Sequence, residues 1–286
     1  MLTEETVFKR ILQTAKENPK IRAVYMNGSR TNPNAPKDRF QDYDIVYIVE
    51  DTKPFIEDKK WLDDFGERYM MQEPDKLDRG IGKDRDFTKS YAYLMLFTDG
   101  LRIDLQVKNK QEGLTDYLKE KMTVKLLDKD NYLPEIPKPT DEDYWVKKPT
   151  PGEFDSIADN FFWCLQNVAK GIQRKELPYA MGMYQETTLT SLHRMMDWWI
   201  GINHDFEVST GKLGKYYENY LPKEYWNLYK DVYPGGDYDS LREAIAAACA
   251  LFQILGKDVA KELGYPYPEQ DEIRMTSYLR KEGCIG

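Results

Sequence analysis

The chain has 286 residues, of which 41% are hydrophobic, enough for a core in one large domain or two smaller ones. Its 49 acidic and 41 basic side chains give a formal net charge of −8, which argues against a nucleic-acid partner because such partners are bound through basic patches. No segment approaches the roughly 18 consecutive apolar residues of a membrane span, so no membrane partner is expected either.

The first part of the chain predicts helices and strands in alternation. Apolar residues at helical spacing predict an amphipathic helix over 3–17. A strand is predicted over 21–26, and it ends at the pair Gly28-Ser29, whose backbone N–H groups could face an anion. Residues 30–41 contain two prolines and many polar groups, so we expect a loop there.

Two carboxylates, Asp42 and Asp44, open the next apolar run, which predicts a strand over 43–49. Side chains at i and i+2 of a strand point to the same face, so these two lie together. Like charges repel, and burying them costs free energy unless a cation compensates. Paired hard oxygen ligands of this kind suit Mg²⁺, which commonly bridges to substrate phosphates.

A third carboxylate follows in a predicted hairpin. Asp99-Gly100 lies between alternating apolar runs at 91–97 and 101–107, a strong signal for two antiparallel strands. Asp104 falls in the middle of the second run, where an unpaired charge is costly. It could be a solvent-facing aspartate of an edge strand, but a metal site shared with the earlier pair explains it better.

The composition changes after about residue 128, where five prolines punctuate a stretch with little periodicity. We expect an N-terminal domain over 1–135, a linker over 136–152 and a helical domain over 153–286. Long amphipathic helices are predicted over 153–176, 179–202 and 239–263, and shorter ones over 212–230 and 268–281. The predicted fold class is therefore α+β, a mixed sheet with flanking helices followed by an all-α bundle.

The cysteines indicate the compartment. There are three, Cys164, Cys249 and Cys284, an odd and scattered set that forms neither a zinc spacing nor a disulfide framework. The acidic first residues do not have the pattern of a secretory signal. We expect a cytoplasmic protein; the sequence does not indicate its oligomeric state.

The sequence lacks the residues or motifs that several metal-binding, hydrolytic and nucleotide-binding sites require. The run after Asp42 lacks the further ligands of an EF-hand loop, two histidines are too few for a histidine-rich zinc site, and no Walker A pattern is present. What remains resembles the DNA polymerase β-like nucleotidyltransferases: a strand, Gly28-Ser29, a loop, Asp42 and Asp44 opening a strand, and Asp104 on a later one.

A narrower resemblance covers nearly the whole chain. The motifs NGSRTN (27–32), FQDYDI (40–45), WLDDFG (61–66), YLMLF (93–97), IDL (103–105) and KGIQRKE (170–176) are similar to those of the aminoglycoside 6-adenylyltransferases. The resemblance implies an N-terminal nucleotidyltransferase domain, a helical domain that closes the antibiotic site, and transfer of AMP from ATP to a hydroxyl of streptomycin. One expected departure from the family is a short tail after the last predicted helix.

This resemblance implies roles for individual residues. Asp42 and Asp44 are expected to hold Mg²⁺ against the phosphates of ATP, and Asp104 to bind a metal, act as general base, or both.

ATP itself is expected to contact Gly28, Ser29 and Arg30. Lys170 and Arg174, at i and i+4 of a helix, could also reach the triphosphate, although a solvated basic face near a helix end explains them as well.

The acceptor is expected to be cationic, because streptomycin carries two guanidinium groups. Carboxylates and exposed aromatic rings recognise such groups. The candidates in the helical domain are Asp159, Glu186 and Asp197, with Asp155 as a further carboxylate and Trp163 or Tyr184 as stacking surfaces. Residues of these types are more often surface charges or core aromatics than ligands, and the structural interpretation is favoured for each of them.

Two other functions stay open at this point. One is transfer to a different small acceptor by the same fold, and the other is a nucleotide-binding regulatory module without turnover. The complete set of three carboxylates favours an enzyme.

Overall fold

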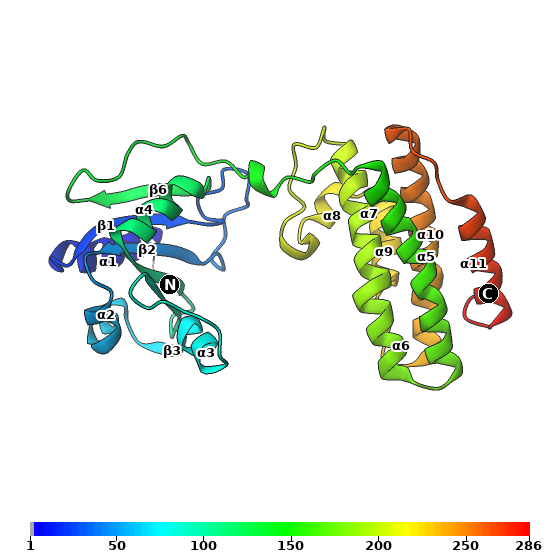
Figure 1. The fold of residues 1–286 in the computed structure, drawn as a ribbon, viewed down its shortest axis with the longest axis horizontal. Coiled ribbons are helices and arrows are strands. Elements are labelled where there is room, and N and C mark those ends of the chain that lie inside the picture. Colours follow the sequence, from blue (N-terminus) through cyan, green and yellow to red (C-terminus); the bar gives the residue numbers. More distant parts are fainter. Residues whose placement is uncertain (1–2) are drawn as a thin grey trace. The chain divides into compact units, whose positions relative to one another are not determined.

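The computed structural model describes residues 3–286, which form two compact units (Figure 1). The N-terminal unit ends at Asp143 and the helical unit spans Tyr144–Gly286, so the boundary falls within the predicted linker 136–152. Among the described residues, no helix combines the length and the apolar character needed to cross a membrane.

The N-terminal unit is built on one mixed sheet of six strands in the order β3-β4-β5-β2-β1-β6. Its strands are β1 (Ile21–Asn27), β2 (Tyr43–Val49), β3 (Arg68–Gln72), β4 (Ser90–Phe97), β5 (Arg102–Asn109) and β6 (Thr123–Asp128). The predicted strand over 43–49 and the predicted hairpin are both present, and the α+β fold class is confirmed. β2 and β5 are parallel neighbours, while the other pairs are antiparallel.

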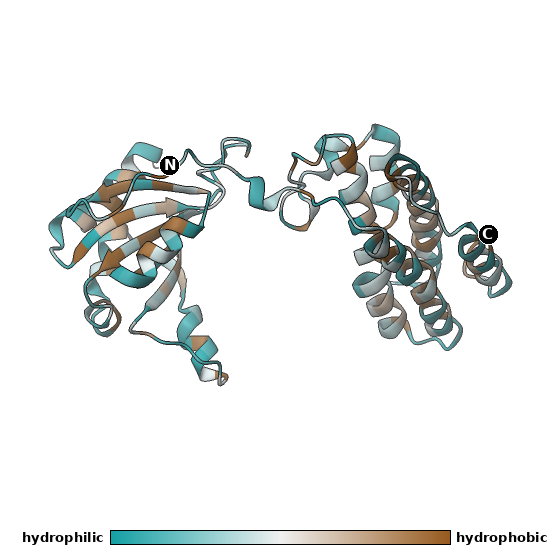
Figure 2. Cartoon of the chain, turned by 45° about the horizontal axis from the view of Figure 1, so that its top comes forward, coloured by the Kyte–Doolittle hydropathy of each residue, from teal (hydrophilic) through white to brown (hydrophobic). Residues whose placement is uncertain are grey.

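Helices cover both faces of the sheet. Helix α1 (Glu4–Glu17) packs on one face, where the Tyr47 hydroxyl donates to the carbonyl of Ile11 at 2.6 Å. Helix α4 (Lys110–Lys119) packs on the other face, and Gly113 lets it approach closely because a Cβ there would lie 2.7 Å from the Ile48 side chain. Apolar residues follow the strands in Figure 2. At Asp44 the second face presents charge instead of an apolar side chain.

Several short elements of this unit carry no clear sequence signal. They are α2 (Lys53–Glu57), η1 (Lys60–Phe65), α3 (Pro74–Gly80) and the two edge strands β3 and β6. The same is true of η2 (Glu142–Tyr144), which spans the boundary between the two units. Edge strands bury less of their surface, so their sequences need not show the alternation of apolar residues that marks a central strand.

The helical unit consists of α5 (Pro151–Gln173), α6 (Leu177–Met183), η3 (Tyr184–Thr188), α7 (Leu189–Ile202), η4 (Lys212–Gly214), α8 (Tyr217–Tyr220), α9 (Lys223–Asp231), α10 (Tyr238–Leu263) and α11 (Glu269–Lys281). The long helices were predicted, with ends that differ by up to three residues. Helix α5 begins where Thr150 and Glu153 form a reciprocal capping box.

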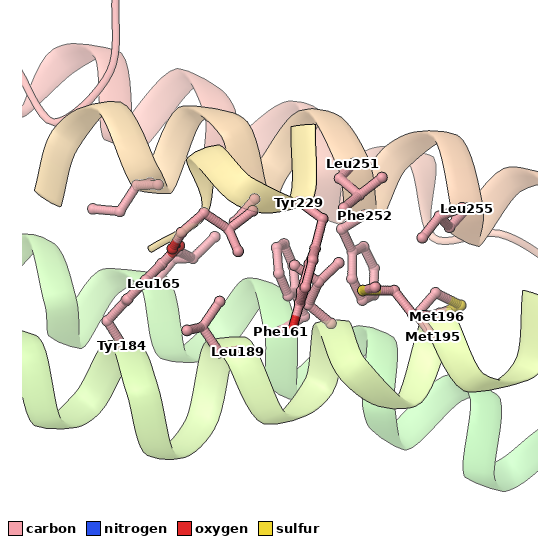
Figure 3. Packing of buried hydrophobic residues seen from close by; sticks show 14 of the residues in the cluster. Phe161, Leu165, Tyr184, Leu189, Met195, Met196, Tyr229, Leu251, Phe252 and Leu255 are labelled. Carbon is pink, nitrogen blue, oxygen red and sulfur yellow. The ribbon is translucent and has the colours of Figure 1, made fainter. Parts of the chain in front are cut away.

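Aromatic and long aliphatic side chains fill the bundle (Figure 3). The rings of Phe161 and Phe252 stack at 3.8 Å between centroids, which joins α5 to α10. The buried Tyr184 hydroxyl lies 2.8 Å from the carbonyl of Val232 and 3.0 Å from that of Ala244. Tyr184 is therefore a core residue and offers no stacking surface.

Two predicted helices are interrupted. The segment 179–202 contains the π turn η3, a single turn with i→i+5 bonding that is too short to be recognised in a sequence pattern. The segment 212–230 is divided into η4, α8 and α9. Leu213 has a positive φ of 58°, and Pro222 precedes α9, so a continuous helix cannot form.

Candidate active site

The pairing of β2 with β5 brings three predicted carboxylates together. In this parallel pair Asp44 and Asp104 are direct neighbours across the strands. Asp42 precedes Asp44 by two residues and presents its side chain on the same face. The register of the sheet therefore creates the carboxylate cluster, defined here as Asp42, Asp44 and Asp104.

Gly28 makes room for this cluster. It follows β1, in which Asn27 pairs with Asp44, and it has a φ of +78°, a conformation that glycine adopts without steric cost. A Cβ at this position would lie 2.1 Å from Oδ2 of Asp44 and 2.8 Å from its Cγ. Gly28 is thus required both by the turn and by the position of the carboxylate.

The cluster is electrostatically unfavourable in the absence of a bound cation. Burial, and then the negative charges of Asp104 and Asp42, raise the pKa of Asp44 to about 6. Burial also raises the pKa of Asp42, although the nearby Arg102 opposes this change. The three carboxylates therefore favour a positively charged partner.

One such partner is Arg102, which the sequence analysis did not single out. Its Nε lies 2.9 Å from Oδ1 of Asp104 and its Nη2 lies 2.7 Å from Oδ2, a bidentate ion pair. Its Nη1 lies 3.3 Å from Oδ2 of Asp42. The alternation of β5 already places Arg102 and Asp104 on one face, but contact with Asp42 depends on the strand pairing.

The residues present fit a divalent cation. The fit is one of chemistry, because over residues 3–286 no three His, Cys, Asp or Glu side chains are already arranged around a common point as a metal site. Arg102 occupies oxygens of Asp42 and Asp104, whereas the Asp44 carboxylate has no hydrogen bond or ion pair to any described residue. Carboxylate oxygens on adjacent strands are the donor set that Mg²⁺ prefers.

Arg30 holds the loop between Gly28 and Asp42. Its side chain is buried, and its Nη2 donates to the carbonyl of Gln41 at 2.8 Å, while Nη1 lies 3.3 Å from Oε1 of Glu4. The guanidinium also lies 3.8 Å from the centre of the Tyr43 ring. These contacts commit Arg30 to positioning the loop, and it does not project toward the carboxylates with free donors.

A buried aspartate that the sequence analysis missed also anchors this loop. Asp141 accepts hydrogen bonds from the side-chain amides of Asn32 and Asn34, each at 3.0 Å. It lies in the stretch predicted as linker, and nothing local in the sequence marks it. The Ser29 hydroxyl, in contrast, has no hydrogen bond to a described residue, so it is available to a ligand.

A cavity of about 440 Å³ opens beside the loop. Arg30 and Tyr43 line it, together with Phe40 and Leu101. Tyr43 alternates with Asp42 and Asp44 along the chain, so the cavity borders the α1 side of the sheet, not the carboxylate side.

The predicted acceptor residues lie on the helical unit in different environments. Asp159 and Trp163 are exposed one turn apart on α5, and the Trp163 side chain is 65% exposed. Glu186 is exposed within the π turn.

Asp197 is instead partly buried. Its Oδ1 accepts hydrogen bonds from Thr210 and Tyr217, each at 2.8 Å, and burial raises the pKa of this carboxyl. The two basic candidates, Lys170 and Arg174, are exposed at the C-terminal end of α5.

Known proteins show a consistent similarity. The family described as streptomycin adenylyltransferase matches residues 1–282. An "Aminoglycoside 6-adenylyltransferase" of Campylobacter jejuni is 38% identical over 283 residues, covering 99% of this chain and 96% of the relative. The protein of the same name from Bacillus subtilis (strain 168) is 34% identical over 285 residues, covering 99% of both. A crystal structure of an aminoglycoside 6-adenyltransferase from Bacillus subtilis matches at 30% identity with a TM-score of 0.49, covering 99% of this chain and 100% of that one.

Proposed function

The chain belongs to the streptomycin adenylyltransferase family and is a nucleotidyltransferase, and on that basis we propose that it transfers AMP from ATP to the 6-hydroxyl of streptomycin. The observation that carries the proposal is the carboxylate cluster beside Gly28 and Ser29. Three ionisable oxygen ligands on adjacent strands, with a glycine turn next to them, suit phosphate chemistry assisted by a divalent cation.

In this reaction the acceptor hydroxyl oxygen forms a bond to the α-phosphorus of ATP. The bond from that phosphorus to the oxygen that bridges to the β-phosphate breaks, and pyrophosphate leaves. A magnesium ion bound to the cluster would supply the positive charge that offsets charge on the phosphates. Asp42 and Asp44 would hold this ion.

The remaining residues of the site bind and position. Asp104, on the strand next to Asp44, would take the proton of the acceptor hydroxyl or help to hold the cation. Ser29, whose hydroxyl is uncommitted, would donate to the β- or γ-phosphate, and the Gly28 turn would let the backbone approach it. Arg30 would keep the loop in the conformation that presents both.

The acceptor would be recognised through charge and stacking by the helical unit. Asp159 and Glu186 are exposed carboxylates that suit guanidinium groups, and Trp163 is an exposed ring on which such a group can stack. Asp197 would contribute through Oδ2, because its hydrogen bonds from Thr210 and Tyr217 go to Oδ1.

The test is a transfer assay with ATP, Mg²⁺ and a panel of aminoglycosides. We expect release of pyrophosphate and a streptomycin product heavier by one AMP, with the modified oxygen identified by NMR. Asp44→Asn should abolish transfer and keep the fold, whereas Asp130→Asn, a carboxylate paired with Arg22 away from the cluster, should leave it unchanged. Binding of ATP without modification of any drug would favour a regulatory module and contradict the proposal.

A further inference from the structure

Arg102 makes more contacts with the carboxylate cluster than any other basic side chain. It satisfies both oxygens of Asp104 at 2.9 and 2.7 Å and reaches Oδ2 of Asp42 at 3.3 Å. All three guanidinium nitrogens therefore face carboxylate oxygens. In direct contact, one positive charge is set against the negative charges of the cluster, while Arg30 acts on Asp42 and Asp44 only from a greater distance.

These contacts are incompatible with the roles proposed for the same carboxylates. An oxygen of Asp104 that accepts a guanidinium hydrogen bond is a weaker ligand for a metal ion and a weaker acceptor for a proton. Arg102 thus covers oxygens of both Asp42 and Asp104, through an ion pair with the first and two hydrogen bonds with the second, and a cation that binds these oxygens would have to displace it.

The surroundings of Arg102 allow it to leave. Its side chain is 45% exposed, compared with 17% for Asp104, and it stands at the first residue of β5. A long flexible side chain at this place can turn toward solvent while the strand keeps Asp104 fixed. Exchange of one cation for another therefore needs no rearrangement of the sheet.

We propose that Arg102 is a built-in cation that holds Asp42 and Asp104 until a divalent metal ion replaces it. It is a positioning residue that competes with the metal, and the inference rests on the function proposed above. In the metal-free protein it keeps the two carboxylates in place and limits their mutual repulsion. Once displaced, the Arg102 guanidinium is free to form an ion pair with the negatively charged nucleotide.

The experiment measures binding of Mn²⁺ alone, without nucleotide, to the full chain by calorimetry or by EPR. Arg102→Gln removes both the competitor and its charge, so we expect Mn²⁺ to bind about tenfold more tightly or better than to wild type. Arg102→Lys keeps the charge but loses the bidentate geometry, so an intermediate gain is expected. If Arg102 had only a structural role, its substitution would not raise the affinity for Mn²⁺.

The matched control is Arg22→Gln. Arg22 also forms a bidentate pair, with Asp130, and its Nε lies 2.8 Å from Oδ2 of that residue, but it is not part of the cluster. Its substitution should leave Mn²⁺ affinity within about twofold of wild type, because only exposed charges away from the site change. Circular dichroism checks that each variant is folded.

The outcomes separate this inference from the proposed function. The competition is refuted if Arg102→Gln binds Mn²⁺ no more tightly than wild type; if that variant does not fold, Arg102→Lys takes its place. This result refutes the competition even when wild type transfers AMP normally. If wild type modifies no aminoglycoside but the Arg102 variants still gain Mn²⁺ affinity, the proposed function fails and the role of Arg102 stands.

Discussion

Substitution of Gly28 by alanine should damage the carboxylate cluster more than it damages the fold. The new Cβ would lie 2.1 Å from Oδ2 and 3.3 Å from Cβ of Asp44. The far end of the Asp44 side chain can rotate away, but then it leaves the position from which it faces Asp104. The backbone also keeps a φ of +78°, which strains alanine.

The magnitudes follow from these two effects. Holding a non-glycine residue in the left-handed region costs about 1–2 kcal/mol, and forcing an extra methyl into a filled space costs about 1–3 kcal/mol. The lower entropy of the unfolded alanine chain offsets about 0.4–1 kcal/mol. We therefore expect a net loss of about 1 to 4.5 kcal/mol in unfolding free energy. We also expect a loss of about 100-fold or more in kcat/KM, since misplacement of a catalytic group by about 1 Å has that effect.

Gly82→Ala is the matched control. Gly82 has a φ of +85°, but a Cβ there would meet no atom within 4 Å, so the control keeps the backbone strain without the clash. Stability is measured by circular dichroism during denaturation and activity by pyrophosphate release. If Gly28→Ala is as active as Gly82→Ala and equally stable, the contact with Asp44 does not matter and the reasoning is refuted.

Three further predictions concern the helical unit. Trp163→Ala should change the unfolding free energy by no more than about 0.5 kcal/mol and should raise KM for streptomycin. Trp198 is a buried ring, so Trp198→Ala should cost about 3–5 kcal/mol of unfolding free energy. Denaturation and kinetics of both variants test this. Asp159→Asn should weaken streptomycin binding and reduce its salt dependence, as measured by calorimetry at two ionic strengths. Burial lowers the pKa of His193 below its ordinary value, so the stability gained from neutral His193 is present above about pH 6.5 and lost as pH falls through the lower folded-state pKa. His193→Gln should therefore flatten the loss of melting temperature on acidification below about pH 6.5, and an unchanged slope would contradict the assignment.

Local patterns in the sequence predicted most of what lies within single strands and helices. A short apolar run identified β2, and the Asp99-Gly100 turn identified the β4–β5 hairpin, because both signals depend on residues close in sequence. The alternation of β5 placed Asp104 on the same face as Arg102 and Gln106. Apolar spacing likewise located α5 and α10, whose stability comes from packing of an amphipathic face.

Features that depend on contacts between distant segments were not predictable. The link from Arg102 to Asp42 requires β5 to lie parallel to β2, and the sequence does not state which strands pair. Asp141 stabilises the loop near Gly28 from more than a hundred residues away, in a stretch that resembles a linker. The π turn within the predicted helix 179–202 was not predicted because it is a single turn inside a longer apolar pattern that is typical of a helix.

The arrangement around Asp44 implies a further measurable property of the N-terminal unit. Repulsion among the three carboxylates is only partly offset by Arg102, so the metal-free fold retains unfavourable charge at this point. A bound divalent cation should relieve it and stabilise the folded state by about 2.7 kcal/mol at a hundredfold excess over its dissociation constant. Asp44→Asn removes one of the charges in advance, so this variant should be more stable than wild type without metal and gain less from its addition. Equal stabilisation of both proteins by Mg²⁺ would show that the cation binds elsewhere, and the assignment of the carboxylate cluster as the metal site would then be wrong.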